Sequence, residues 1–148
     1  MTIEERVKLY RKIFKVCKAK IALESFILPV DKLEALEAIR ALNTTLADLY
    51  MVSIPVITVW VRDNSYVPET GEIYLTEPEL EAFLHQFRHH LQNVERKYER
   101  RGLTTEGNLE QAKIPYEECV YKLRGEDDAI AWSRFLVIEY NKHNSKED

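Results

Sequence analysis

The hydrophobic pattern changes its period twice along the chain, and this limits the fold to a class with separate helical and β segments. Residues 1–23 and 31–49 carry apolar side chains at helical spacing. Between residues 54 and 75 the chain instead contains β-branched and aromatic residues and turn signals. Helical spacing returns from residue 76. The pattern predicts an α+β fold: an N-terminal helical pair, a small antiparallel sheet and a C-terminal helix pair.

The boundaries of the helices follow from apolar stripes and capping residues. Residues 1–23 form one predicted helix with the stripe Ile3, Val7, Tyr10, Phe14, Cys17 and Ile21. Asp31 is the predicted N-cap of a second helix that packs antiparallel to the first. Thr76-Glu-Pro-Glu79 predicts the start of a long helix that ends near Arg101. The last helix is expected from Glu126 to about Lys142.

The β segment reads as a hairpin. Residues 54–61 and 72–75 are the two predicted strands, and Asp63-Asn64-Ser65 is a turn signal between them. Pro68 cannot donate to a strand ladder, so it is expected at an edge or outside the sheet. We therefore expect the exposed edge of the sheet at 66–75.

Length and composition limit the number of domains and the classes of function that we expect. A chain of 148 residues with 45% hydrophobic residues is long enough for one domain, 1–148, with a buried core. The net charge of −4 makes general coating of nucleic acid an unfavoured function. No apolar run reaches the roughly 18 residues of a membrane span. The N-terminus lacks the apolar segment of a signal peptide, so a cytoplasmic location and no membrane partner are expected.

The use of cysteine and glutamine adds two weaker expectations. Cys17 and Cys119 are far apart in the sequence, and such cysteines in a cytoplasmic chain are usually buried thiols. Charged residues make up 31% of the chain, and glutamine occurs only at Gln86, Gln92 and Gln111. Many charges with few amides favour a thermophilic source.

Three of the four histidines fall within six residues of the long predicted helix. His85 and His89 are one helical turn apart, so their imidazoles can converge on one metal ion. A zinc site needs a third protein ligand, and the first turn of the last helix supplies acids at Glu126 and Asp128. His90 and His143 are not expected to bind metal. The alternative is that the histidines are ordinary surface or core residues of an amphipathic helix.

These motifs resemble those of the short zincin metallopeptidases. In that family a His-Glu-x-x-His helix is followed by a helix with a Glu-x-x-Ala motif that ends in an aromatic residue. Here His85-x-x-x-His89 is followed by Glu126-x-x-Ala129-Ile-Ala-Trp132. The resemblance covers 54–142 and leaves 1–50 as a helical N-terminal addition. It implies a zincin-like helix pair, with zinc held by His85, His89 and Glu126, and Asp128 as the fallback ligand.

The chain departs from the family pattern at the catalytic position. Gln86 stands where the family has the glutamate that takes a proton from metal-bound water. An amide cannot act as a base near neutral pH, and loss of a general base lowers rates by about 10²–10⁴-fold. The resemblance therefore implies a degenerate metallopeptidase homologue without ordinary peptidase activity. Its cleft could retain a peptide or protein partner, paired with the edge strand within 66–75.

Two other functions are left open by the sequence. The first predicted helix has a basic face that includes Lys8, Lys12 and Lys15, and a small regulatory or assembly module could use it to bind a partner or nucleic acid. Alternatively, the protein is an active metallohydrolase in which Glu81 or Glu126 replaces the missing base.

Overall fold

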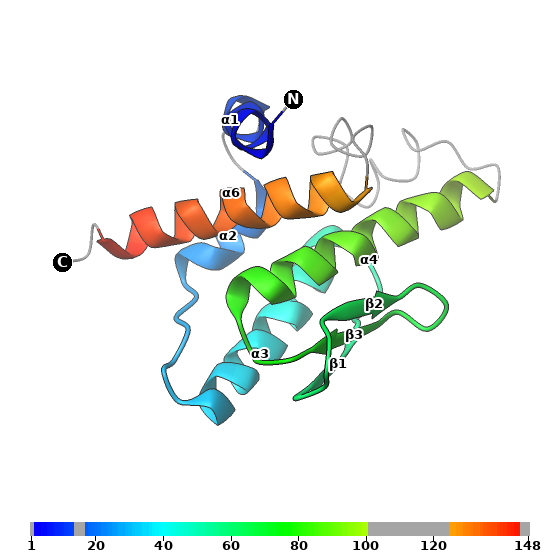
Figure 1. Ribbon diagram of the computed structural model, residues 1–148, viewed down its shortest axis with the longest axis horizontal. Coiled ribbons are helices and arrows are strands. Elements are labelled where there is room, and N and C mark those ends of the chain that lie inside the picture. Colours follow the sequence, from blue (N-terminus) through cyan, green and yellow to red (C-terminus); the bar gives the residue numbers. More distant parts are fainter. Residues whose placement is uncertain (1, 14–16, 101–124, 146–148) are drawn as a thin grey trace.

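The central element of the fold is helix α4, Leu80–Arg100. The computed structural model describes residues 2–13, 17–100 and 125–145. Helix α6, Gly125–Ser145, packs along one side of α4, and a three-stranded sheet lies on the other side of α4 (Figure 1). The α+β class predicted from the sequence is confirmed.

The N-terminal segment forms two helices, so the prediction of one continuous helix over 1–23 is wrong. The described helices are α1, Ile3–Ile13, and α2, Lys18–Glu24. Cys17 has extended backbone angles (φ −95°, ψ 140°) and stands at the N-terminus of α2. The two helices bury different partners: α1 packs on α6, whereas α2 packs on both α3 and α6. Ile21, the last member of the predicted stripe, is consequently 48% exposed.

Helix α3, Lys32–Tyr50, begins at the predicted cap. The carboxylate of Asp31 accepts hydrogen bonds from the backbone N–H groups of Leu33 and Glu34, both at 3.0 Å. Most of the apolar side chains that lie at helical spacing in this segment are buried, although Leu33, near its start, is 64% exposed. The helix ends at Met51 in the left-handed conformation (φ 55°).

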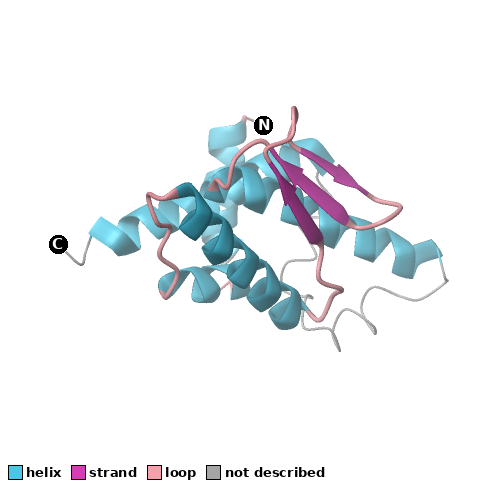
Figure 2. Ribbon diagram, turned by 90° about the horizontal axis from the view of Figure 1, so that it is seen from below, coloured by secondary structure: helices cyan, strands magenta, loops and turns pink. Residues whose placement is uncertain are grey.

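The sheet is mixed, so the expectation of purely antiparallel pairing is wrong. It contains β1, Val56–Val59, β2, Ser65–Val67, and β3, Glu72–Leu75, in the order β1-β3-β2. Strand β3 pairs in parallel with β1 and antiparallel with β2 (Figure 2). The β-branched and aromatic composition predicted strands, but it carried no information on which strand would enter the middle of the sheet. Because β3 is central, only β2 supplies an edge within 66–75.

The hairpin of this sheet joins β2 to β3. The backbone N–H of Gly71 donates to the carbonyl of Val67 at 2.8 Å and closes the turn. Gly71 has a φ of 74°, a backbone conformation that residues other than glycine rarely adopt. Pro68 lies in the turn, outside the ladder, as predicted.

Helix α4 begins later than the capping signal predicted. Its first residue is Leu80, and the carbonyl of Glu79 accepts from the N–H of Phe83 at 3.0 Å. The backbone N–H of Thr76 instead donates to the side chain of Asn64 at 2.8 Å. This bond holds the segment between β3 and α4 against the loop before β2.

One continuous core joins the N-terminal helices to the rest of the described fold. Buried residues of α1, α2 and α3 pack in the same cluster as those of the sheet, α4 and α6. Cys17 is fully buried, and its Sγ lies 3.7 Å from the hydroxyl of Tyr50, while Cys119 lies outside the described residues. In the described part of the chain, no helix is both long and apolar enough to cross a membrane. The largest fully buried side chains of the cluster are Trp132, Tyr10, Tyr50, Phe83, Phe87 and Phe135.

Candidate metal centre

Helix α4 presents His85 and His89 on the same face, towards the N-terminus of α6. The opposite part of the helix surface is anchored in the core by the fully buried Leu84, Phe87 and Leu91. This anchoring leaves the two histidines at the border of the core, with side chains 19% and 22% exposed. Their Nε2 atoms are 3.2 Å apart, as the one-turn spacing predicted.

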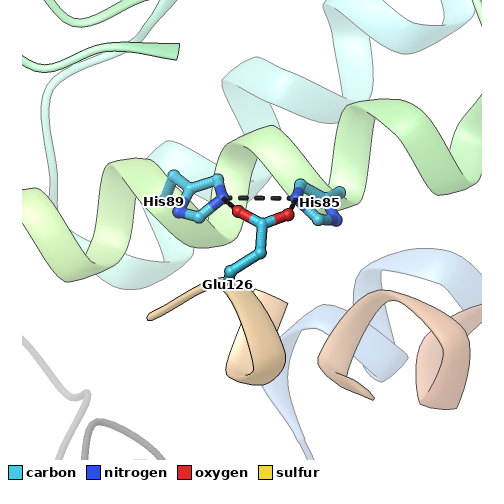
Figure 3. Close-up of side chains that lie close together, drawn as sticks. All are labelled: His85, His89 and Glu126. Atoms are coloured by element: carbon cyan, nitrogen blue, oxygen red, sulfur yellow. Dashed lines mark hydrogen bonds and ion pairs between the residues drawn. The ribbon is translucent and has the colours of Figure 1, made fainter. Parts of the chain in front are cut away.

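Glu126 in the first turn of α6 completes the group. One carboxylate oxygen lies 2.9 Å from Nε2 of His85, and the other lies 3.1 Å from Nε2 of His89. Figure 3 shows the carboxylate between the two rings, with one oxygen directed at each imidazole. The structure thus brings together three of the predicted site residues from segments 37 positions apart in the sequence (126 − 89).

The three side chains could hold a metal ion. Ligand atoms that lie about 2.0–2.1 Å from a tetrahedral zinc ion are roughly 3.3 Å from one another. The distances of 2.9–3.2 Å among the two imidazole nitrogens and the carboxylate oxygens come close to that spacing. Burial lowers the pKa of His85, and this effect exceeds the opposing attraction of the Glu126 carboxylate. The neutral imidazole, which is the form that binds metal, is therefore favoured.

Gln92 orients the ring of His89, a role that the sequence analysis missed. The amide nitrogen of Gln92 donates to the Gly125 carbonyl at 2.9 Å and to Asp128 at 2.6 Å. Its oxygen therefore faces Nδ1 of His89, 3.0 Å away, and Nδ1 must be the donor. With Nδ1 as the donor, the ring's other nitrogen, Nε2, is the one directed at Glu126 and His85. Metal-binding histidines commonly have such a partner on the second nitrogen.

Asp128, the fallback ligand, belongs to a buried network and is not in the group formed by His85, His89 and Glu126. It is fully buried, and its carboxylate accepts from Arg88 Nε at 2.9 Å. The same carboxylate accepts from Gln92 and from the hydroxyl of Tyr10 on α1. Because these donors occupy it, Asp128 ties α1, α4 and α6 together beside the metal group. Its neighbour Glu126, 66% exposed, is the acid that reaches the histidines.

Gln86 lies beside His85 on the wall of a divided cavity. One part, of about 340 Å³, is lined by Glu81, Arg134 and other residues of α4 and α6. The other part, of about 320 Å³, is lined by the end of β2 and by the three residues of the candidate metal group. His85, Gln86 and Asn64 line both parts. The residue in the position of the family's base thus faces the same space as the metal group.

The third histidine of the cluster has a structural position. His90 is buried, and its Nε2 donates to the carbonyl of Ser53 at 2.7 Å. Its Nδ1 accepts from the hydroxyl of Tyr66 at 2.7 Å, and Asn93 donates to the same hydroxyl at 2.9 Å. These bonds hold β2 and the segment before β1 against α4. The expectation that His90 is not a ligand agrees with this geometry.

The basic face of the N-terminal segment is partly neutralised within the fold. Arg6 pairs with Asp127 at 2.8 Å, and Arg11 lies 3.8 Å from Glu139 on α6. Lys8 and Lys12 are exposed, and Lys15 lies outside the described residues.

Comparison with known proteins adds no relative. No protein-family model matches the chain, and the searches of curated proteins and of solved structures give no significant match.

Proposed function

We propose that this protein is a zinc-binding homologue of the zincin metallopeptidases that lacks ordinary peptidase activity and binds a peptide or protein segment in its cleft. The observation that carries the proposal is the convergence of His85, His89 and Glu126, with Gln86 facing the same cavity. The proposal rests on this geometry and on the resemblance of the two motifs.

The chemistry of the donor set favours zinc. Two imidazole nitrogens and one carboxylate are a ligand set of catalytic zinc sites, which leave a fourth position open. Magnesium and calcium prefer oxygen ligands alone. The orientation of His89 by Gln92 also fits a site organised before the ion binds.

The identity of residue 86 argues against hydrolysis. A carboxylate next to His85 could accept a proton from metal-bound water, whereas an amide cannot. Glu81, the alternative base, lies one turn before His85 and 3.7 Å from Arg134, which offsets its charge. Glu126 contacts both histidines and is better suited to hold the ion. We therefore favour the inactive form of the family over the active one.

The position of β2 supports the binding of an extended peptide. Strand β2 pairs only with β3 among the described strands, so its other edge has backbone groups available for a further strand. Ser65 and Tyr66 of β2 line the cavity that contains His89 and Glu126. A peptide added to this edge would pass the metal group.

Metal analysis of protein purified without chelator tests the proposal. We expect about one zinc per chain, lost in His89→Ala and kept in the matched control His143→Ala, whose histidine lies in the last turn of α6. The wild-type protein should not hydrolyse generic peptides or unfolded protein with added zinc. Failure to bind zinc would contradict the metal proposal, and zinc-dependent cleavage abolished by His85→Ala would favour an active hydrolase.

Binding of nucleic acid or a partner through the basic helix has less support. Arg6 and Arg11 of α1 already pair with acids of α6, which reduces the charge that the helix offers to a phosphate backbone.

A further inference from the structure

Gln86 has a polar side chain at the wall of the cavity. It is only 7% exposed, and it lines both parts of the space beside His85. None of the side-chain hydrogen bonds found in the described part of the chain involves its amide. The amide atoms of Gln86 are not among the fully buried side-chain atoms that lack a partner, so they face the open space of the cavity. The amide is thus available to a molecule in the cavity.

The charge of the metal group decides which kind of ligand fits there. A divalent ion bound by two neutral imidazoles and the single carboxylate of Glu126 would retain one uncompensated positive charge. The other charged residues that line the cavity are Glu81 and Arg134, which are of opposite sign and lie 3.7 Å apart. An anion at the open position would balance the remaining charge.

A glutamate at position 86 would reverse this preference. Its carboxylate would cancel the positive charge of the group and repel a second anion in the cavity. The amide has the same shape, carries no charge and supplies two N–H donors. Replacement of the acid by Gln86 therefore changes a site suited to water and its proton into one suited to a carboxylate.

We propose that the metal-loaded cleft binds a carboxylate of a peptide, with the Gln86 amide donating a hydrogen bond to it. The inference rests on the proposed function and specifies its ligand. The open edge of β2 beside the cavity indicates that the carboxylate belongs to an extended chain. Both a free C-terminus and an acidic side chain offer the same chemistry.

The experiment compares short peptides on protein whose zinc content has been measured first. The probes are acetyl-Ala-Ala-Ala with a free C-terminus, the same peptide with a C-terminal amide, and acetyl-Ala-Asp-Ala-amide. Calorimetric titration should show at least one carboxylate peptide binding about tenfold more tightly than the uncharged amide, as a charge-assisted hydrogen bond would give. The better of the two acids identifies the source of the carboxylate.

Variants separate the role of Gln86 from that of the metal. Gln86→Glu should retain zinc and lose this preference of about tenfold for the acid. Asn141→Asp, at an exposed amide of α6, is the matched control and should keep it. Equal binding of acid and amide peptides by zinc-loaded wild type would overturn the inference and leave the metal proposal intact. An unchanged preference in Gln86→Glu would also overturn it, and a protein that binds no zinc would remove the proposed function itself.

Discussion

The side-chain oxygen of Gln92 lies 3.0 Å from Nδ1 of His89 and so determines which nitrogen of that ring faces the metal group. The two residues are three positions apart on α4, hence on neighbouring turns of one face. The opposite end of the amide is held by Gly125 and Asp128 of α6. One residue therefore couples the packing of the two helices to the orientation of a candidate ligand.

Replacement of Gln92 by Met should weaken zinc binding. The apolar side chain of similar size cannot accept from His89, and loss of the hydrogen-bond partner that orients a metal-binding histidine lowers metal affinity by about 10–100-fold. Titration against a competing chelator measures the change. His143→Ala is the control, and an affinity equal to that of wild type would show that Gln92 does not organise the site.

Asp128 and Glu126, two positions apart on α6, should have different roles: Asp128 in stability and Glu126 in zinc binding. Asp128→Asn removes the charge that faces the buried Arg88 and should lower the free energy of unfolding by about 3–5 kcal/mol. Glu126→Gln alters a side chain that is 66% exposed and should change stability by less than about 0.5 kcal/mol while abolishing zinc binding. Urea denaturation and metal analysis of both variants provide the test. Retention of zinc by Glu126→Gln would exclude it as a ligand.

A glutamate at position 86, as in the zincin motif that the sequence resembles, should create activity. In Gln86→Glu a carboxylate would stand beside the metal group, and we expect weak, zinc-dependent peptide hydrolysis from it. A fluorogenic peptide library measures the gain over wild type. The double variant Gln86→Glu/His85→Ala should be inactive. If the single variant shows no turnover while zinc is bound, a glutamate at position 86 is not sufficient for hydrolysis.

Stability of the metal-free protein should fall as the pH is lowered through the range of histidine. Burial lowers the pKa of His85 in the folded state, so the unfolded chain binds more protons below its ordinary pKa of about 6.5. The contribution of His85 to the free energy of unfolding is therefore fully present above its ordinary pKa. It decreases as the pH falls towards the lower pKa of the folded state. Urea denaturation at several pH values should show a smaller slope for His85→Gln than for wild type. An identical slope would mean that His85 does not titrate differently on folding.

The basic face predicted for the N-terminal segment should contribute little to folding. Replacing Lys8, Lys12 and Lys15 with Gln should change the free energy of unfolding by a few tenths of a kcal/mol each at most. Thermal melting measures this directly. A salt-sensitive shift of DNA or RNA that disappears in the triple variant, with unchanged melting, would establish the basic helix as a binding surface.

The sequence predicted the parts of the site that depend on local spacing. His85 and His89 share a face because α4 places residues four apart above one another, whatever the rest of the fold does. The Asp31 cap was predictable for the same reason, since a side chain and two backbone groups within three residues form it. The absence of a glutamate at position 86 is likewise read directly from the sequence, and the missing base remains what the resemblance to the zincin motif implies.

Only the tertiary structure decided features that depend on segments distant in the sequence. The motif resemblance preferred Glu126 to Asp128, but only the packing of α6 on α4 directs Glu126 towards the histidines and buries Asp128 against Arg88. Tertiary packing also decided the parallel pairing of β1 with β3 and the break between α1 and α2 at Cys17. The sequence could not predict them, because alternative packing partners satisfy the same apolar pattern. Local spacing thus determines which side chains can act together on one element, whereas the free energy of packing elements together determines which of them meet.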